Sequence, residues 1–240
     1  MKKCISFIKA DLIALSLLLS GCATTSGEVN DPLEPYNRAM YSFNDAVDTA
    51  ILKPVTKGYD AVTPDPIQQG VGNFFSNLND ITVILNDVLQ FKFAQALHDS
   101  GRFLLNSTVG IAGVFDVAST AGLNKNDEDF GQTLGAWGVD SGAYIVLPFF
   151  GPRTLRDTAG LICDVHTDPV TYIDDVRTRN ALTIVKVIDK RASLFGTEKV
   201  LEQATTDEYS YVRDAYLQHR QHVVFDGEPP EEDFDLFEDE

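Results

Sequence analysis

Side chains that commonly carry out catalysis are few in this chain and poorly spaced for it. The four histidines are His98, His166, His219 and His222. Only His219 and His222, three residues apart, could reach one metal ion from a helix, and no cysteine or carboxylate completes a recognisable zinc pattern around them. Two exposed histidines on a helix surface are the better interpretation, so we predict neither a metal site nor a cofactor.

No nucleophile or phosphate-binding loop stands out either. A Gly-x-Ser-x-Gly turn is absent, and the glycines between 131 and 142 lack the spacing of a dinucleotide-binding loop. Cys163 lies between apolar neighbours, which favours a small core residue over a reactive thiol. The carboxylates of residues 127–129 precede an apolar run, and helix capping explains them better than calcium, which needs more oxygen ligands. We therefore predict no catalytic residue, which favours binding or transport over an enzyme.

The strongest chemical motif is Leu19-Ser20-Gly21-Cys22, which ends a short N-terminal segment. Three lysines precede or flank an apolar run over residues 12–19, which is too short for a membrane-spanning helix of about 20 residues. A cysteine after two small residues is typical of a bacterial lipoprotein signal, in which the thiol is diacylated before cleavage. We predict a lipoprotein signal peptide over residues 1–21 and lipidation of Cys22, with an uncleaved apolar N-terminus as the alternative.

The residues after this cysteine indicate which membrane holds the anchor. Ala23 and Thr24 follow it, in place of the aspartate that commonly retains a lipoprotein at the inner membrane. By analogy with that sorting rule, we expect a lipid-anchored protein on the periplasmic side of the outer membrane. Several acyl chains make such an anchor firm, because each buried methylene contributes about 0.8 kcal/mol.

The chain is strongly acidic, with a formal net charge of −17 over 240 residues. Residues 1–21 carry three lysines and one aspartate, so the net charge without them is −19. Nucleic acid is therefore excluded as a partner. Residues 226–240 hold nine carboxylates and no lysine or arginine. This composition predicts an acidic disordered tail, with a docking peptide for a basic partner as the minority alternative.

Between a polar spacer at residues 22–30 and the tail, residues 31–225 are predicted to form one mainly α-helical domain. Asp31 and Pro32 are suited to an N-cap and a first helical residue, and Pro54 should end or kink that helix. Thr205 and Glu208 have the spacing of a capping box that opens a last helix.

Apolar residues recur at three- and four-residue steps along most of this domain. The resulting stripes contain Leu33, Tyr36, Met40, Phe43, Val47 and Ile51 in the first helix, Phe93, Leu97 and Leu104 in a later one, and Ala181, Ile184, Val185 and Ile188 near the C-terminus. The lysines and arginines between 175 and 191 could meet phosphate headgroups, but a solvated helix face is the preferred interpretation.

The middle of the chain is rich in glycine and poor in charge. Residues 103–115 contain no charged side chain, and the apolar run of residues 144–150 follows several glycines. No stretch after residue 22 reaches the 18 apolar residues of a spanning helix. A buried core with tight turns and short elements that touch hydrocarbon without crossing it are both compatible with this pattern. A short extended segment is expected around Ile145.

Several motifs resemble the VacJ-type (MlaA) lipoproteins of Gram-negative outer membranes. They span nearly all of residues 31–170 and agree with the lipidation motif. The matching segments are Asp31-Pro32-Leu33-Glu34, Asn37-Arg38, Phe43-Asn44, Lys53-Pro54-Val55, Lys57-Gly58-Tyr59, Asn73-Phe74-Phe75-Ser76-Asn77-Leu78, Gly101-Arg102-Phe103-Leu104-Leu105-Asn106-Ser107-Thr108, Phe115-Asp116-Val117-Ala118, Glu128-Asp129-Phe130-Gly131-Gln132-Thr133-Leu134-Gly135, Trp137-Gly138-Val139, Leu147-Pro148, Gly151-Pro152 and Thr154-Leu155-Arg156-Asp157.

The resemblance implies a ring-like domain of amphipathic helices that lies in the outer membrane around a polar channel. Such proteins remove mislocalised phospholipids from the outer leaflet and pass them to a periplasmic lipid-carrier protein, for retrograde transport that maintains lipid asymmetry. They also associate with a trimeric porin. One alternative is a lipid-anchored docking platform for a porin or envelope complex without transport activity. Another is a lipid-modifying enzyme that depends on His98 or His166.

Four positions carry more specific expectations from this resemblance. Phe43 and Asn44, a family-like pair, are hypothesised to shape or gate the channel, while ordinary core and surface roles are the alternative. Phe91 stands where relatives often have glycine, and Ala143 stands where they often have proline. Both departures fall in expected loops, so they put local geometry in question more than the fold.

Overall fold

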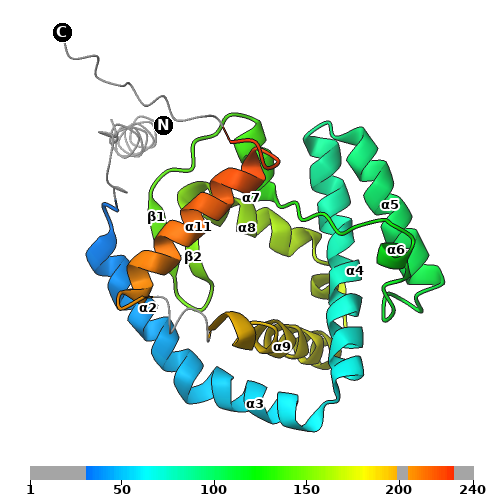
Figure 1. The fold of residues 1–240 in the computed structure, drawn as a ribbon, viewed down its shortest axis with the longest axis horizontal. Helices are drawn as coiled ribbons and strands as arrows, with labels where there is room; N and C mark the ends of the chain where they lie inside the picture. Colours follow the sequence, from blue (N-terminus) through cyan, green and yellow to red (C-terminus); the bar gives the residue numbers. More distant parts are fainter. Residues whose placement is uncertain (1–30, 199–204, 230–240) are drawn as a thin grey trace, which may run out of the picture. The chain divides into compact units, whose positions relative to one another are not determined.

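The computed structural model describes residues 31–198 and 205–229, and residues from Pro32 onward form one compact unit (Figure 1). The predicted signal peptide, the predicted lipidation site Cys22 and the spacer at residues 22–30 lie outside the described residues. The same is true of residues 230–240 in the predicted acidic tail.

The unit is mainly α-helical, as the sequence predicts. Its elements, in chain order, are α2 (Glu34–Val47), the π-helical turn η1 (Asp48–Leu52), α3 (Lys53–Val62), α4 (Asp65–Leu89), α5 (Phe93–Thr108), α6 (Val117–Thr120), α7 (Phe130–Ala136), β1 (Tyr144–Leu147), β2 (Gly151–Thr154), α8 (Leu155–Thr167), the 3-10 turn η2 (Pro169–Tyr172), α9 (Val176–Ala192) and α11 (Glu208–Val224).

The two strands form an antiparallel hairpin in which Tyr144 pairs with Thr154. Strand β1 confirms the extended segment expected around Ile145, whereas β2 was not predicted.

The helices follow one another around a closed circuit (Figure 1). Helix α2 continues through η1 into α3, and the long helix α4 contacts α5, α7, α8 and α9. The circuit closes because α11 contacts α7 and β2, while α2 contacts β1. This arrangement confirms the ring-like organisation of amphipathic helices within one domain.

Two predicted helix starts are wrong by a few residues. Helix α2 begins at Glu34 with Leu33 at its N-cap, so Asp31 is not the N-cap residue. Pro35 takes the early helical position instead, where a missing N–H costs nothing. At the C-terminal end, α11 begins at Glu208 and its cap is Asp207, whose carboxylate accepts from Ser210 N.

Pro54 neither ends the helical segment nor leaves it as a single α-helix. The chain passes through the π-helical turn η1 and resumes as α3, with Pro54 among the first residues of α3. Proline is tolerated there because the first turn of a helix leaves its backbone N–H groups without helical partners.

The buried side of α4 is mostly polar, although it includes Phe75 and Val83, and its exposed side is largely apolar. Asp80, Asn86 and Asp87 are buried, and Asp87 is 0% exposed. Ile81 and Leu85 lie among the exposed large hydrophobic residues. In a water-soluble helical protein, the apolar stripe faces the core and the polar side faces water. The burial pattern of α4 is therefore reversed.

The apolar stripes predicted from the sequence show the same reversal. Leu97 and Leu104 of α5 are 76% and 60% exposed, while Asp99 and Arg102 on the other side are buried. Ile184 of α9 is also exposed. Of the helices that the structure describes, none is both long enough and apolar enough to cross a membrane.

The interpretation of the α9 cations as a solvated face is wrong for two of them. Lys186 Nζ lies 2.6 Å from Asp168 Oδ2, and Arg191 forms two 2.8 Å contacts with the carboxylate of Asp48. These ion pairs tie α9 to other parts of the ring. Lys190 is exposed, as expected.

A small apolar core lies where the hairpin meets α2 and α11. Tyr144, Val146 and Tyr209 form its buried centre, and Met40 and Tyr216 pack against it. Phe149 and Phe150, at the hairpin turn, are exposed. The apolar run of residues 144–150 is thus divided between a buried core and an exposed tip.

Candidate functional site

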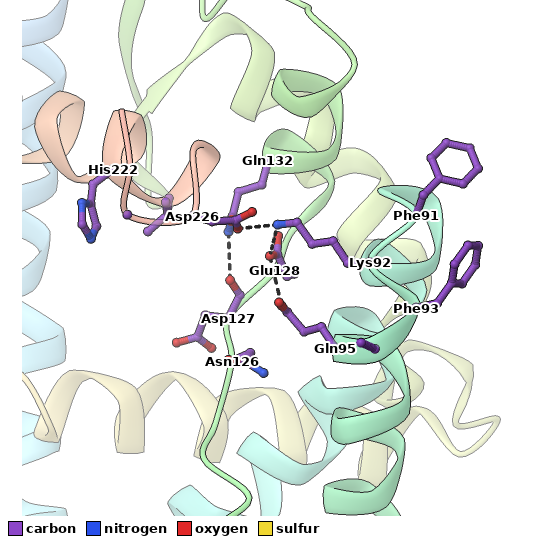
Figure 2. A pocket seen from close by; sticks show the side chains of 13 residues that line it. Phe91, Lys92, Phe93, Gln95, Asn126, Asp127, Glu128, Gln132, His222 and Asp226 are labelled. Atoms are coloured by element: carbon purple, nitrogen blue, oxygen red, sulfur yellow. Dashed lines mark hydrogen bonds and ion pairs between the residues drawn. The ribbon is translucent and has the colours of Figure 1, made fainter. Parts of the chain in front are cut away.

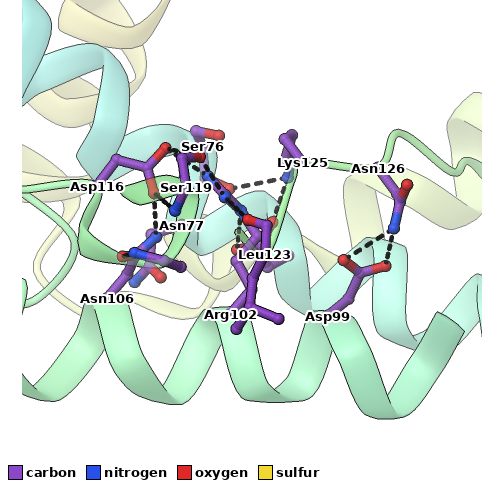
Figure 3. A network of polar contacts seen from close by, with 12 residues as sticks. Ser76, Asn77, Asp99, Arg102, Asn106, Asp116, Ser119, Leu123, Lys125 and Asn126 are labelled. Atoms are coloured by element: carbon purple, nitrogen blue, oxygen red, sulfur yellow. Dashed lines mark hydrogen bonds and ion pairs between the residues drawn. The ribbon is translucent and has the colours of Figure 1, made fainter. Parts of the chain in front are cut away.

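A buried polar network joins α5 to α6 and the residues on either side of α6 (Figure 3). Arg102 of α5, 3% exposed, donates to Asp116 Oδ2 at 2.8 Å, to Ser119 Oγ at 2.8 Å and to the carbonyl of Leu123 at 2.7 Å. Asn106, one turn further along the helix, donates to Asp116 Oδ1 at 3.0 Å and accepts from Ala118 N. Burial alone would raise the pKa of Asp116, but hydrogen bonds from Ser119 and Arg102 lower it below its usual range.

The same network holds the chain at residues 125 and 126. Lys125 Nζ contacts the buried carboxylate of Asp80 on α4, and Asn126 donates to both oxygens of Asp99 at 3.1 and 3.0 Å. Polar side chains at helical spacing on α4 and α5 therefore fix the segment that leads directly into residues 127–129. They are the structural basis for the position of those three carboxylates.

Asp129 caps α7, which confirms helix capping for this member of the acidic group. Its Oδ1 accepts from Gln132 N at 2.8 Å, and both of its oxygens receive hydrogen bonds from Arg220 at 2.6 and 3.0 Å. Arg220, which is buried on α11, also donates to Asp157 at 2.8 Å. Burial would raise the pKa of Asp157, but the adjacent Arg220 guanidinium lowers it overall. One arginine thus connects α11 with the starts of α7 and α8.

The crossing of α7 and α8 depends on two glycines. A Cβ atom added to Gly160 would lie 2.4 Å from the backbone nitrogen of Gly131. A Cβ added to Gly131 would lie 2.5 Å from Asp157 Oδ1. Only glycine permits this close approach of the two backbones.

The ring elements converge on an interior pocket of about 340 Å³. We call it the interior pocket. Residues from α4, the loop before α7, β2, α8 and α9 line this pocket. The charged residues that line it are Asp127, Glu128, Asp129, Arg153, Asp164, Asp168 and Lys186.

Asp164 is the carboxylate of this pocket with the clearest perturbation. Its Oδ1 accepts from Phe130 N at 3.0 Å. Burial raises the pKa of Asp164 to about 6, and the hydrogen bond from Phe130 opposes that rise. Near neutral pH the group is therefore mostly ionised, and it becomes neutral in mildly acidic solution.

A second pocket of about 730 Å³ adjoins the first, because Asp127, Glu128 and Gln132 line both (Figure 2). We call it the outer pocket. Glu128, 5% exposed, accepts from Lys92 Nζ at 2.9 Å and from Gln90 Nε2 at 2.8 Å. Lys92 Nζ also contacts the carboxylate of Asp226, which lies in the turn after α11.

The rim of the outer pocket carries the two exposed rings of Phe91 and Phe93, which point away from its polar interior (Figure 2). Phe91 has a φ of 63°, a left-handed conformation that glycine adopts without strain. This geometry gives a physical reason for the glycine expected at this position in relatives.

Comparisons with known proteins agree with this architecture. A family model described as MlaA lipoprotein matches residues 29–223. The chain belongs to the MlaA lipoprotein family. A relative from Escherichia coli (strain K12) is 36% identical over 231 residues, covering 92% of this chain and 91% of the relative. A relative from Haemophilus influenzae is 33% identical over 221 residues, covering 88% of each chain. Both are named "Intermembrane phospholipid transport system lipoprotein MlaA".

A solved structure gives the same answer at the level of the fold. It superimposes with a TM-score of 0.71 at 33% sequence identity, and the match covers 82% of this chain and 100% of the other. That structure is described as the "Structural basis for maintenance of bacterial outer membrane lipid asymmetry".

The MlaA-like pair Phe43 and Asn44 contacts the turn of the β-hairpin. Asn44 Nδ2 donates to the carbonyl of Leu147 at 2.9 Å, and Asn44 Oδ1 accepts from Phe149 N at 2.8 Å. The rings of Phe43 and Phe149 meet edge to face with centroids 5.4 Å apart. The pair therefore holds the hairpin tip against α2.

Asn37, two helical turns earlier on α2, contacts the hairpin in the same way. It donates to the carbonyl of Tyr144 at 3.1 Å and accepts from Val146 N at 2.8 Å. The two asparagine amides thus substitute for a neighbouring strand along β1. Their spacing of seven residues places both on one face of α2, and this regularity was a signal that the sequence offered.

The other residues singled out from the sequence lie apart from the two pockets or at their edges. His219 and His222 are exposed on α11, and His222 lines the outer pocket. His98 lies 3.2 Å from Asp99, and Cys163 is half-buried on α8. Within residues 31–198 and 205–229, no group of three histidine, cysteine or acidic residues is placed to hold a metal ion.

Arg153 and Asp164 were missed by the sequence reasoning. Arg153 belongs to a strand that was not predicted, and Asp164 falls within an ordinary helical pattern. The polar pairs that position the loop, such as Asp99 and Arg102, were present as a helical stripe opposite Leu97 and Leu104. That stripe was visible in the sequence, but the sequence did not show that the stripe would be buried.

Proposed function

We propose that this protein removes mislocalised phospholipids from the outer leaflet of the outer membrane through its polar interior. It passes them to a periplasmic lipid-carrier protein for retrograde transport and so maintains lipid asymmetry. In this proposal Cys22 carries the lipid anchor on the periplasmic side, and the protein performs no catalysis. The names of its relatives and the subject of the matching solved structure support this role.

The observation that carries the proposal is the reversed burial pattern. Large apolar side chains, among them Val62, Leu97 and Leu104, are exposed on the helices, whereas Asn37, Asp87 and Arg102 are buried. Exposed apolar surface of this extent is costly in water and favourable in hydrocarbon. We therefore expect the helices to lie in the membrane with their apolar sides toward the acyl chains.

The polar interior supplies what a migrating phospholipid needs. Moving a charged headgroup through hydrocarbon costs several kcal/mol or more unless polar groups replace its water. The interior pocket offers carboxylates, a guanidinium and an ammonium within the ring. A lipid could keep its headgroup in this polar environment while its tails remain beside apolar side chains.

Two partners belong to the proposal by family resemblance. A trimeric porin would hold the ring in the outer membrane, and the periplasmic carrier would receive the lipid. A docking platform for a porin or envelope complex, without transport activity, is the rival role. The exposed apolar surface suits either, but the polar interior has a use only in transport.

The decisive experiment measures phospholipid in the outer leaflet of cells that lack this protein. The same cells are restored with the wild-type chain or with Cys22→Ala, at matched expression. We expect phospholipid to rise on deletion, to return to normal with the wild type and to stay high with Cys22→Ala. An unchanged outer leaflet on deletion would reject transport in favour of the docking platform, and correction by Cys22→Ala would reject the need for the anchor.

Asn44 offers a test of the proposal that Phe43 and Asn44 gate the interior. The substitution Asn44→Ala removes both hydrogen bonds to the hairpin tip and should cost about 1 kcal/mol of stability, too little to unfold the domain. We expect it to change outer-leaflet phospholipid in the restored cells. Ser42→Ala, at an exposed neighbouring position of α2, is the control. If both variants behave as wild type while thermal unfolding confirms the loss of stability for Asn44→Ala alone, the hairpin contact is structural and not a gate.

A further inference from the structure

The interior pocket contains one cation that is not paired. Arg153 lies on β2 opposite Ile145 and lines the pocket. Its Nε is buried without a hydrogen-bond partner, and no ion pair to Arg153 occurs among residues 31–198 and 205–229. The other cation of the pocket, Lys186, is bonded to Asp168 at 2.6 Å. No hydrogen bond to the Nη groups of Arg153 occurs in those ranges either, so they are the donors that an incoming anion can reach.

A second feature of the pocket is the carboxylate of Asp127. Asp127 is exposed, and no hydrogen bond or ion pair to its carboxylate occurs within the described part of the chain. Figure 2 shows this carboxylate turned away from Lys92 and Glu128. Because Asp127 lines both pockets, it stands where the interior pocket opens into the outer one.

The remaining acidic groups have partners that fix them. Glu128 is bonded to Lys92, and Asp129 to Arg220. Asp164 accepts a backbone hydrogen bond but forms no ion pair with any residue in the described ranges, so it adds negative charge to the pocket. The charge of Arg153 acts on Asp164 and opposes the rise of its pKa, although no ion pair joins the two. The wall thus presents one guanidinium without a hydrogen-bonded partner beside an excess of carboxylates.

We propose that Arg153 and Asp127 recognise the two charges of a zwitterionic phosphoethanolamine headgroup, with Arg153 on the phosphate and Asp127 on the ammonium. A guanidinium suits a phosphate because its planar donors match the phosphate oxygens. A primary ammonium donates hydrogen bonds to carboxylates. The inference rests on the proposed function and adds a headgroup preference to it.

This arrangement discriminates against anionic headgroups. Phosphatidylglycerol carries the phosphate but no ammonium, so it would leave Asp127 and Asp164 without a counter-charge near its own negative charge. Like charges at close range disfavour binding. Phosphatidylethanolamine should therefore move through the interior faster than phosphatidylglycerol.

The test uses the lipidated full chain in phosphatidylcholine vesicles that contain a trace of acyl-labelled phosphatidylethanolamine or phosphatidylglycerol. The rate at which label leaves the outer leaflet is followed by chemical quenching. We expect phosphatidylethanolamine to move several-fold faster. Arg153→Gln should slow both lipids about tenfold, the effect of losing one charge-assisted hydrogen bond, and Arg153→Lys should retain most of the rate. Asp127→Asn should bring the two rates close together.

Matched controls are Arg177→Gln and Asp140→Asn, which change exposed residues outside both pockets. Both should keep the wild-type rates and the wild-type ratio. Thermal unfolding of each variant separates a loss of fold from a loss of recognition. The ratio of the phosphatidylethanolamine rate to the phosphatidylglycerol rate is measured with the wild type, so this part of the test holds even if a variant fails to fold.

The outcomes separate this inference from the proposed function. Movement of both lipids at equal rates, or wild-type rates with Arg153→Gln, overturns the headgroup preference and leaves phospholipid transport intact. No movement of either lipid overturns both.

Discussion

At the scale of single residues, Asp87 is the buried group with the largest expected effect of pH. Neither of its oxygens has a hydrogen-bond partner in the described structure when Asp87 is ionised. Burial, followed by the charge of Asp99 and a hydrogen bond that protonated Asp87 donates to Asp99, raises the pKa of Asp87 to about 7, and Lys92 opposes the rise. Since the unfolded chain ionises near its ordinary pKa of 3.8, the folded state loses stability as pH rises from about 4 to about 7. Above that window the loss is complete.

The substitution Asp87→Asn should remove this dependence. The amide keeps a donor for Asp99 but cannot ionise, so we expect the variant to be more stable than the wild type at pH 8 by about 1–3 kcal/mol and similar to it near pH 4. Thermal unfolding in detergent from pH 4 to 8 measures the difference. Asp174→Asn, at an exposed position, should leave the profile unchanged. A constant gap between Asp87→Asn and wild type at every pH would show that ionisation of Asp87 is not responsible.

At the scale of elements, the crossing of α7 and α8 is the contact least tolerant of added volume. Gly160→Ala would place a methyl group against the backbone of Gly131, so the helices must separate. We expect a loss of about 1–3 kcal/mol or more in the free energy of unfolding. Gly58→Ala is a matched control, because its Cβ would meet nothing within 4 Å on α3. That variant should gain up to about 1 kcal/mol from helix propensity. Equal stability of the two variants would contradict the close packing.

At the scale of the whole molecule, the exposed apolar surface should decide association with membranes. The full chain carrying Cys22→Ala, synthesised with phospholipid vesicles present, isolates this surface from the lipid anchor. Adding Leu97→Glu and Leu104→Glu should lower flotation with vesicles at least tenfold, since a charge at the centre of a bilayer costs about 2.5–3.5 kcal/mol. Gln69→Glu, a charge at an exposed polar position of α4, is the control. Equal flotation of all three proteins would mean that α5 faces water.

The sequence predicted much of the architecture because helical periodicity and glycine placement are local signals. The helices, the segment around Ile145 and the cap at Asp129 follow from residue types a few positions apart. The start of α2 at Glu34 and the second strand were not predicted. A helix end and a strand pair depend on contacts with residues distant in the sequence, which local patterns do not reveal. The family resemblance rested on motifs such as Gly131-Gln132, whose physical reason, the crossing with Gly160, was visible only in three dimensions.

By itself, the sequence determined a mainly helical, acidic domain with amphipathic faces and a resemblance to MlaA lipoproteins. Only the tertiary structure decided which face of each helix points inward. An amphipathic helix has the same apolar stripe in its sequence whether that stripe packs against a protein core or against hydrocarbon, because the periodicity depends only on the spacing of apolar residues. The packing of α4 against α5 buries the polar sides of both helices, where Asp80, Asp99 and Arg102 lie, and leaves their apolar sides exposed. The same long-range contacts bring Arg153 and Asp127 to one pocket, although 26 positions separate them in the chain.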